Sequence, residues 1–247
     1  MSVSCTNSLK KIVLITGANK GLGFEIALKL SQKNFKVIMA DKDKQFESKN
    51  KIICRSGNED VYDYFLDLSS FESVRCFTKK LLEKESYVDV LVNNAGIFCM
   101  KQRKTADCLD GVMQVNHLGA VHYYNTKLCN MIASKGFAEK LQKNNIMSNC
   151  VHPRMMNTTL LTKSHKGRGD FCSNLEESAA KFIVKSVTRD AAQCVNAVAF
   201  LAYSDKVKNV SGRYFCDYQV HREPRVLEDK QFCDAIWKES EKLVGLQ

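Results

Sequence analysis

The chain has 247 residues, of which 45% are hydrophobic and 26% are charged. This length fits one α/β domain with a sizeable core, and the near-average composition argues against a disordered or fibrous protein. We therefore treat residues 1–247 as one domain with a flexible N-terminus over residues 1–10. No run approaches the roughly 18 apolar residues of a membrane span, and the N-terminus lacks the apolar core of a secretory signal. These features predict a soluble, intracellular, cytoplasmic protein.

The cysteines and the charge exclude further classes of protein. Eleven cysteines are spread singly without a C-x-x-C pair, which is typical of reduced thiols rather than a disulfide framework. Cys150 and His152 lie close together, but two potential ligands without another pair are more often part of a strand, so we predict no metal. The net charge of +10 comes from scattered lysine and arginine groups. It favours a solvated surface over a nucleic-acid face.

A glycine motif follows the first predicted strand. Residues 12–15 form a short apolar run that is suited to a buried strand. Gly17, Gly21 and Gly23 follow, and apolar residues at helical spacing begin at Leu22. This order is typical of a turn in which backbone N–H groups and the positive end of a helix dipole approach a pyrophosphate. The alternative is an ordinary strand-to-helix turn without a ligand, because glycine spacing alone is weak evidence.

A carboxylate ends the second predicted strand, which covers residues 35–40. In a dinucleotide-binding fold, an acidic residue about 20 positions after the glycines can hydrogen-bond the adenosine ribose. Asp41 would repel a 2′-phosphate, whereas the adjacent Lys42 could hold one. The sequence therefore predicts NAD(H) or NADP(H) as cofactor, with a modest preference for NAD(H). Ordinary turn residues are the alternative for both positions.

The rest of the chain alternates between predicted strands and helices. We expect strands at residues 61–68, 88–92, 145–151 and 213–216, helices at residues 69–84, 190–203 and 226–244, and a charged surface helix or loop at residues 44–60. The spacing of Ser69 and Glu72 predicts a capping box at the start of the helix over residues 69–84.

Six motifs, in this order, resemble those of the short-chain dehydrogenase/reductase family. They are TGANKGLG at residues 16–23, Asp67-Leu68, NNAG at residues 93–96, VNHLG at residues 115–119, YYNTK at residues 123–127 and His152-Pro153. The tail, residues 211–215 and 237–244, is similar to the last strand and C-terminal helix of the retinol-dehydrogenase-like branch. The resemblance implies an α/β fold with a Rossmann-type doubly wound parallel sheet. It also implies an NAD(P)-dependent oxidoreductase acting on an alcohol or carbonyl substrate such as a retinoid, a steroid or a lipid aldehyde.

The resemblance further implies roles for single residues. Tyr123 would be the catalytic acid/base, and Lys127, one helical turn later, would lower the pKa of its phenol and hold the nicotinamide ribose. Asn116 would anchor the proton-relay water. The cofactor-binding residues would be Gly17, Asn19, Lys20, Gly21, Leu22, Gly23, Asp41, Lys42, Asp67, Leu68, Asn94, Ala95, Gly96, Lys127, Pro153 and Thr158.

Two of these assignments concern the ends of the cofactor. Asp67 would reach the adenine and Thr158 the nicotinamide carboxamide, while residues 155–175 would form the substrate loop.

A tyrosine and a lysine at the spacing of Tyr123 and Lys127 are by themselves more often a surface pair on a helix. The catalytic assignment therefore depends on the surrounding motifs.

The chain departs from the family between Asn116 and Tyr123. Only six residues separate them, whereas the family has a helix continuation and a strand there, ending in the serine that polarises the substrate oxygen. A whole βαβ unit takes about 30 residues, so this strand and its serine are absent. We expect a sheet one helix–strand unit shorter than the family standard. The strand at residues 145–151 would then move beside the one at residues 88–92.

The apolar pattern predicts one long helix over residues 106–143, bent at Gly119. In such a helix Asn116 and Tyr123 would lie about 10 Å apart along the axis. Arg154 is a second departure, because the family has glycine there. We therefore expect weakened catalysis and a compromised family homodimer interface. The alternative is a catalytically impaired pseudo-enzyme or truncated isoform that retains partial dinucleotide binding.

Overall fold

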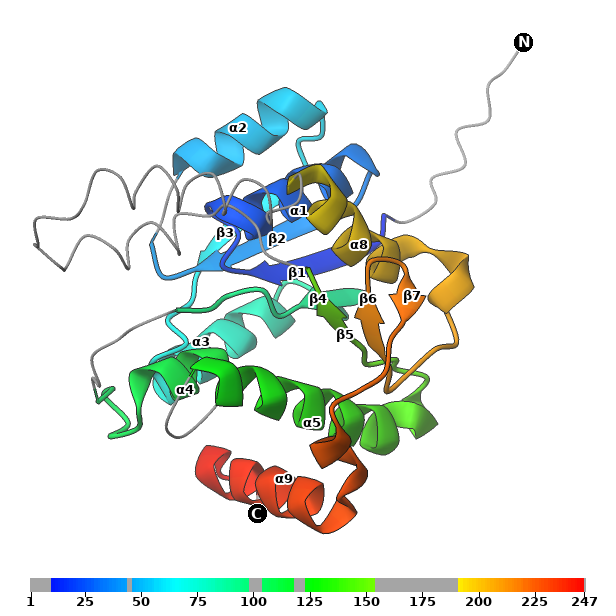
Figure 1. The fold of residues 1–247 in the computed structure, drawn as a ribbon. Coiled ribbons are helices and arrows are strands. Elements are labelled where there is room, and N and C mark those ends of the chain that lie inside the picture. The colour runs from blue at the N-terminus through cyan, green and yellow to red at the C-terminus, as the bar shows by residue number, and fades with distance from the viewer. Residues whose placement is uncertain (1–9, 44–45, 98–103, 118–122, 154–190, 247) are drawn as a thin grey trace, which may run out of the picture. The chain divides into compact units, whose positions relative to one another are not determined.

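The computed structural model describes residues 10–43, 46–97, 104–117, 123–153 and 191–246 (Figure 1). These residues form two compact units. The first contains the described residues up to Leu66 together with residues 75–94, and the second contains residues 67–74 and the described residues from Ala95 onward. No helix within the described ranges is both long and apolar enough to cross a membrane.

The first unit is built on a parallel sheet. Its strands are β1 (Ile12–Thr16), β2 (Lys36–Asp41), β3 (Val61–Phe65) and β4 (Val90–Val92), in the order β3-β2-β1-β4. Helices α1 (Gly21–Gln32) and α2 (Phe46–Ser56) lie on one face, and α3 (Phe71–Leu82), of which residues 75–82 belong to this unit, lies on the other (Figure 1). The predicted order of strand, glycine turn and helix is confirmed.

The core of this unit is the pair β1 and β2. Every residue of β1 is buried, as are residues 37–40 of β2. Such continuous apolar runs are typical of parallel strands covered on both faces. β3 instead alternates between buried Val61 and exposed Tyr62, and it lies at an edge of the sheet. The core therefore places the carboxyl end of β1, and the turn after it, on a rigid support.

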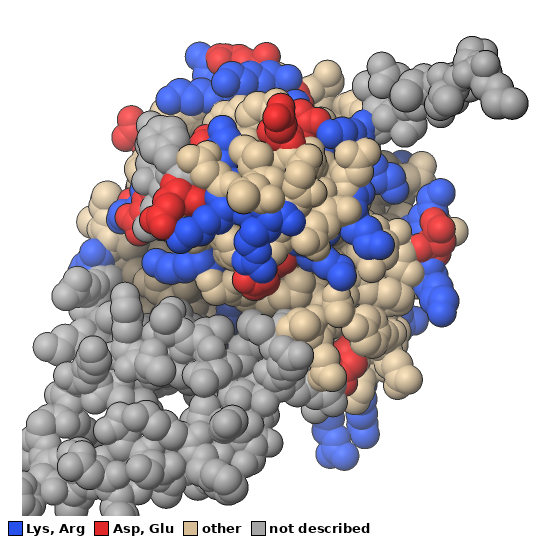
Figure 2. Space-filling view, turned by 90° about the horizontal axis from the view of Figure 1, so that it is seen from above, with Lys and Arg blue, Asp and Glu red and all other residues tan. Residues whose placement is uncertain are grey.

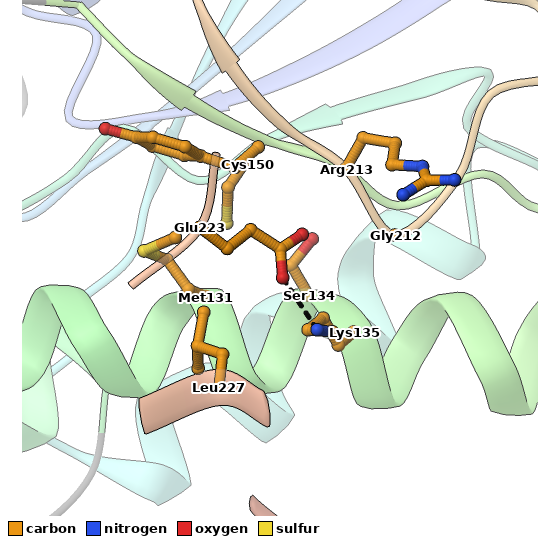
Figure 3. A pocket seen from close by; sticks show the side chains of 9 residues that line it. Met131, Ser134, Lys135, Cys150, Gly212, Arg213, Glu223 and Leu227 are labelled. Atoms are coloured by element: carbon orange, nitrogen blue, oxygen red, sulfur yellow. Dashed lines mark hydrogen bonds and ion pairs between the residues drawn. The ribbon is translucent and has the colours of Figure 1, made fainter. Parts of the chain in front are cut away.

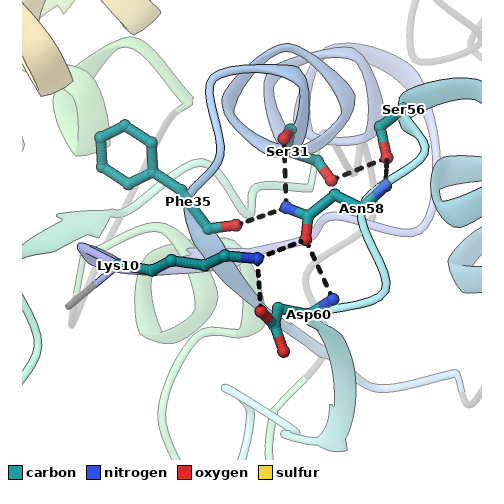
Figure 4. A network of polar contacts seen from close by, with 6 residues as sticks. All are labelled: Lys10, Ser31, Phe35, Ser56, Asn58 and Asp60. Atoms are coloured by element: carbon teal, nitrogen blue, oxygen red, sulfur yellow. Dashed lines mark hydrogen bonds and ion pairs between the residues drawn. The ribbon is translucent and has the colours of Figure 1, made fainter. Parts of the chain in front are cut away.

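Asn58 fixes the turn between α2 and β3 (Figure 4). Its Nδ2 donates to the carbonyl oxygens of Ser31 (3.1 Å) and Phe35 (2.8 Å). Its Oδ1 accepts from Nζ of Lys10 (3.2 Å) and from the N–H of Asp60 (3.1 Å). Because the side chain is buried and bonded through both its nitrogen and its oxygen, the network holds α1, α2 and the sheet in one arrangement.

The charged side chains of this unit are interspersed by sign. Figure 2 shows aspartate and glutamate among the lysines and arginines of one face. Ion pairs join Lys51 to Glu47 (2.5 Å) and Arg55 to Glu25 (3.6 Å). Exposed pairs of this kind contribute little to stability. They do break up the basic surface, as expected of scattered solvated charge.

The second unit contains a separate sheet in the order β5-β6-β7. β5 (Cys150–His152) pairs in parallel with β6 (Tyr214–Cys216), which pairs antiparallel with β7 (Gln219–Val220). The helices are α4 (Gly111–Asn116), α5 (Tyr123–Leu141), α8 (Ala191–Tyr203) and α9 (Lys230–Val244), and short 3₁₀ turns cover Gln142–Asn144, Asp205–Val207 and Arg225–Glu228. α9 runs alongside α5 (Figure 1).

The strand predicted at residues 145–151 begins at Cys150 and pairs with β6. Its predicted place beside β4 concerns both units together and stays a prediction. The backbone before β5 fixes the pairing with β6. The N–H of Gly212 donates to the carbonyl of Ser148 (2.7 Å), and the N–H of Cys150 donates to the carbonyl of Arg213 (2.9 Å). These bonds direct the segment to β6.

The single helix predicted over residues 106–143 is wrong. α4 begins at a cap, because Oδ1 of Asp110 accepts the N–H of Met113 (3.0 Å). It ends at His117, whose φ of −168° and ψ of −25° lie outside the helical region. Apolar periodicity does not show the N-cap at Asp110 or the end of α4 at His117. The pattern therefore predicted one helix where the structure has two.

α4 packs against α5. Asn116 bonds to Oγ1 of Thr126 (3.4 Å), and Nδ1 of His117 lies 3.1 Å from Oδ1 of Asn130. Residues that far apart along a straight helix would be separated by about 15 and 20 Å. Asn116 therefore contacts the first part of α5 from a separate helix. The bend predicted at Gly119 lies outside the described residues.

α5 and α9 pack most closely at Gly136. A Cβ at this position would lie 2.1 Å from Cε3 and 2.4 Å from Cζ3 of Trp237. Phe137 meets the same ring edge to face with centroids 5.1 Å apart, and Nζ of Lys140 lies 4.9 Å from the ring centroid. Glycine is therefore required here by the approach of α9.

We predict that Gly136→Ala destabilises the chain by about 1–3 kcal/mol, because the added methyl overlaps a packed ring. Urea denaturation followed by far-UV circular dichroism measures the change, because the signal must remain in a control variant that lacks Trp237, the single tryptophan. In Gly136→Ala/Trp237→Leu the cost of the alanine is expected to be smaller than in the wild-type background. Equal midpoints for Gly136→Ala and wild type would contradict the packing.

Candidate active site

The turn after β1 is shaped by its glycines. Gly17 and Gly21 have φ of 66° and 59°, in the left-handed region that favours glycine. A Cβ at Gly23 would lie 2.2 Å from the carbonyl oxygen of Gly17 and 2.4 Å from Nδ2 of Asn94. Asn94 spans the turn by donating to the carbonyl oxygens of Thr16 (2.9 Å) and Gly17 (3.0 Å). The structure thus brings four of the predicted cofactor residues together at the carboxyl end of β1.

Unused donors gather at this turn. The N-cap residue of α1, Lys20, makes no side-chain hydrogen bond to the first turn of the helix. Asn19 is buried, and its Nδ2 has no hydrogen-bond partner within the described residues. An unsatisfied buried donor costs roughly 1–3 kcal/mol. Together with the positive end of the helix dipole, these groups suit an anionic ligand that carries acceptor oxygens, such as a phosphate.

Asp41 lies at the end of β2 and faces the same turn. Its Oδ2 accepts the N–H of Asn19 (3.1 Å). Burial raises the pKa of the Asp41 carboxyl, and N–H donors of Asn19, Lys42 and Asp43 oppose the shift. Ser48 of α2 donates to the carbonyl of Asn19 (2.7 Å) and closes this corner. The carboxylate is therefore held in a fixed position beside the glycine turn.

Three predicted residues converge in the second unit. A Cβ at Gly96 would lie 3.3 Å from Oδ1 of Asn116 and 3.6 Å from Nζ of Lys127. Tyr123 is the first residue of α5, one helical turn before Lys127. The predicted separation of Asn116 from Tyr123 along the axis of one fused helix does not apply, because α4 and α5 are separate elements.

Both polar atoms of the Asn116 side chain are hydrogen-bonded. Its Oδ1 accepts the N–H of Ile97 (2.8 Å), and its Nδ2 donates to the carbonyl of Ile97 (3.0 Å) and to Oγ1 of Thr126 (3.4 Å). The amide thereby fixes the loop that contains Gly96. The sequence interpretation missed Ile97 and Thr126, although Thr126 lies within the quoted YYNTK motif.

Lys127 is half-buried. Burial lowers the pKa of its amine, and the neighbouring Cys150 opposes this shift. Burial raises the pKa of the Cys150 thiol, whose Sγ lies 3.5 Å from the carbonyl of Asn130. Residues four apart share a helix face, so the backbone places Tyr123 on the side of α5 that carries Lys127.

Asp67 follows β3, which ends at Phe65 and so is shorter than predicted. Its Oδ1 accepts both the N–H (2.9 Å) and the hydroxyl (2.5 Å) of Ser69. The capping box predicted to start at Ser69 is therefore wrong. Oγ of Ser70 accepts the N–H of Ser73 (3.2 Å) instead. Nothing in these contacts tests the predicted role of Asp67 toward an adenine.

Part of the predicted site lies at or beyond the limit of the described residues. Pro153 is described and follows β5 directly. Thr158, Arg154 and the predicted substrate loop at residues 155–175 lie outside the described ranges. The predicted contacts of these residues with nicotinamide and substrate remain predictions.

A hollow in the second unit is distinct from these groups (Figure 3). Residues of α5, β5 and the segments flanking the β6–β7 hairpin line it, and an ion pair between Lys135 and Glu223 (2.7 Å) lies within it. No predicted catalytic residue is among the described residues of its lining. We therefore assign no substrate to it.

The family model for short chain dehydrogenases matches residues 11–137, more than half of the chain. The chain belongs to the short-chain dehydrogenase family. This is a family of oxidoreductases that act on small-molecule substrates. The matched range includes the glycine turn, Asn116, Tyr123 and Lys127.

Curated relatives indicate the branch of the family to which the chain is similar. Human retinol dehydrogenase 13 is 28% identical over 96% of this chain and 85% of that protein, and human retinol dehydrogenase 14 is 27% identical over 96% and 87%. The alignment with retinol dehydrogenase 13 runs over 286 positions, more than the 247 residues available here, so that relative has segments without a counterpart in this chain. The predicted resemblance to the retinol-dehydrogenase-like branch is confirmed.

Solved structures show the fold. Levodione reductase has a TM-score of 0.68 at 19% identity, covering 84% of this chain and 96% of that chain. The 3-oxoacyl-[acyl-carrier protein] reductase of Brucella melitensis, solved in complex with NAD, has a TM-score of 0.66 at 18% identity, covering 85% and 96%. The predicted α/β fold of Rossmann type is confirmed.

Proposed function

We propose that this chain binds a nicotinamide dinucleotide at the glycine turn after β1 and acts as an oxidoreductase on an alcohol or carbonyl substrate, with weakened catalysis. The observation that carries the proposal is the turn itself. A side chain at Gly23 would collide with the backbone, and the buried Nδ2 of Asn19 lacks a partner within the described residues. A Cβ at Gly21, by contrast, would meet no atom within 4 Å. A pyrophosphate bound at the start of α1 would accept from such donors.

Similar proteins support this choice of cofactor. The Brucella melitensis reductase was solved with NAD, and L-sorbose reductase of Gluconobacter frateurii with NADPH and L-sorbose. In this chain the N-terminus of α1 and the glycine turn would hold the phosphates, and Asp41 would meet the adenosine ribose. The bound dinucleotide would supply or accept the hydride.

The chain's own residues would move the proton. The phenol of Tyr123 would donate a proton to a carbonyl or take one from an alcohol, since a positioned acid/base contributes typically 10²- to 10⁴-fold to rate. A tyrosine of ordinary pKa near 10 needs a nearby cation to act as a base at neutral pH, and Lys127 would supply it. Asn116 would keep the loop at Gly96 in place beside Lys127.

The missing serine separates two candidate functions. Loss of one hydrogen-bond donor to the substrate oxygen typically costs roughly 10²- to 10³-fold in rate. Slow oxidoreduction of a retinoid, a steroid or a lipid aldehyde is the function we propose. Dinucleotide binding without turnover is the second candidate, favoured by the six-residue spacing between Asn116 and Tyr123, which leaves no room for the strand that carries the serine.

Two measurements test the proposal. The purified chain is titrated with NADH and NADPH by fluorescence, and turnover is then measured with retinol and with simple aldehydes. Binding with slow turnover supports the oxidoreductase. Binding without turnover supports the second candidate. Absence of binding to either dinucleotide would refute both.

We predict that Asp41→Ala shifts the ratio of affinities toward NADPH by roughly tenfold, about 1.4 kcal/mol, because it removes a carboxylate that repels a 2′-phosphate. The wild type is expected to prefer NADH modestly, since Lys42 offsets part of that repulsion. Asp43→Ala, two residues later and exposed, is the matched control and should leave the ratio unchanged. A clear NADPH preference in the wild type would contradict the assignment.

A further inference from the structure

His117 joins three helices beside the candidate site. It is the C-cap residue of α4. Its Nδ1 lies 3.1 Å from Oδ1 of Asn130 on α5, and its Nε2 lies 3.4 Å from Oγ of Ser240 on α9. Both partners are uncharged. Burial lowers the pKa of the imidazole, although the hydrogen bond to Asn130 opposes this. The side chain is therefore neutral at neutral pH and acts through hydrogen bonds.

Two neighbouring residues at the end of α4 are hydrogen-bonded to α5. Asn116 bonds to Thr126, and His117 bonds to Asn130, one turn further along the same helix. Two hydrogen bonds fix both the rotation of α4 and its position along α5, which one hydrogen bond cannot do. Thr126 is 1% exposed, so its hydrogen bond lies in the interior. The end of α4 is thereby placed with little freedom.

That placement continues to the candidate catalytic lysine. Asn116 holds both backbone groups of Ile97, and the neighbouring Gly96 lies against Lys127. A shift of α4 would therefore move the loop at Gly96 relative to Lys127. Misplacement by about 1 Å at a reacting centre can cost roughly 100-fold in rate.

α9 is the outer support of this arrangement. The hydroxyl of Ser240 has one proton, which it donates to Nε2 of the neutral His117, and the carbonyl of Ile236, 2.8 Å from its Oγ, is the competing acceptor on its own helix. Gly136 and Trp237 lock α9 to α5 at close range. His117 therefore lies between two helices whose relative position is already fixed by packing.

We propose that His117 is a positioning residue that couples the C-terminal helix α9 to the loop at Gly96 and so holds this loop against Lys127. The inference rests on the proposed function, which gives Gly96 and Lys127 their roles. It assigns to α9 a part in the active centre, although no predicted site residue lies on α9.

Three variants test the proposal. His117→Leu keeps an apolar side chain of similar size but cannot bond to Asn130. His117→Asn can donate from its Nδ2 near the place of Nδ1. Ser240→Ala removes the bond to α9, and Gln231→Ala, at an exposed position of α9, is its matched control.

The main readout is hydrogen exchange at the N–H of Ile97, which donates to Asn116 and does not depend on turnover. We expect its protection to fall at least tenfold in His117→Leu, to fall less in Ser240→Ala, and to recover in His117→Asn. The N–H of Val37 in β2, which donates to the carbonyl of Asp60, is the internal reference and should keep its protection. Turnover should fall roughly tenfold in His117→Leu and recover in His117→Asn.

Each outcome decides the proposal. Unchanged protection of Ile97 in His117→Leu would overturn it, and so would an equal loss at Val37, which would indicate general destabilisation. Failure of His117→Asn to restore Ile97 would also overturn it. If the wild type shows no turnover but Ile97 responds as expected, the coupling to α9 stands and the proposed oxidoreductase function fails.

Discussion

Tyr123→Phe is expected to lower turnover at least 100-fold, with the affinity for the dinucleotide unchanged. The change removes the hydroxyl that, by the proposed function, would exchange a proton with the substrate oxygen, and such acid/base groups are worth typically 10² to 10⁴ in rate. The six-residue spacing between Asn116 and Tyr123 leaves no room for the family's serine-bearing strand, so we expect no serine to take over part of this role. Steady-state turnover and a fluorescence titration with NADH measure the two effects.

The adjacent Tyr124 supplies the control. Tyr124→Phe removes a hydroxyl from the next position of α5, and successive positions of an α-helix are rotated by about 100°. Turnover in this variant should stay close to that of the wild type. If Tyr123→Phe retains wild-type turnover, the activity measured does not arise from the site assigned here. If both variants lose activity equally, the effect comes from the stability of α5.

Local sequence was sufficient where local physics decides the structure. The run over residues 12–15 became β1 because its apolar residues can only be buried, and the glycines after it became a turn because Gly17 and Gly21 adopt positive φ. Asp41 reached the turn because it ends the neighbouring parallel strand. Each of these inferences depends on residues that are close in sequence or fixed by strand register.

The wrong predictions concern features that depend on residues far apart in the sequence. α4 ends at His117, whose partners lie 13 and 123 residues away on α5 and α9, and no sequence window contains them. The pairing of β5 with β6 likewise depends on bonds to residues near Gly212, far along the chain. The convergence of Asn116 with Lys127 follows from the end of α4 and could not be inferred from helical spacing.

The packing of α9 also bears on assembly. Gly136, Phe137 and Lys140 of α5 are in contact with Trp237 of the same chain. A second copy could reach this face of α5 only if α9 moved away. The compromised family homodimer interface remains a prediction, and the contact with Trp237 gives it a physical basis that is independent of the missing strand.

Gly23→Ala is expected to lower the affinity for NADH and NADPH at least 100-fold. The new Cβ would lie 2.2 Å from the carbonyl oxygen of Gly17 and 2.4 Å from Nδ2 of Asn94, and real Cβ atoms do not approach other atoms so closely. The turn would have to open, which would move its N–H groups away from the phosphates and break the bonds by which Asn94 spans it. Fluorescence titration with each dinucleotide measures the loss.

Gly57→Ala separates this effect from a loss of folding stability. Gly57 has φ of 70°, so alanine is strained there by roughly 1–2 kcal/mol, yet its Cβ would meet no atom within 4 Å. Both variants should therefore be destabilised in urea, but only Gly23→Ala should lose the dinucleotide. Unchanged affinity in a folded Gly23→Ala would show that the cofactor does not approach the turn. Equal losses in both variants would trace the effect to stability, because Gly57 lies between α2 and β3 and has no part in the turn after β1.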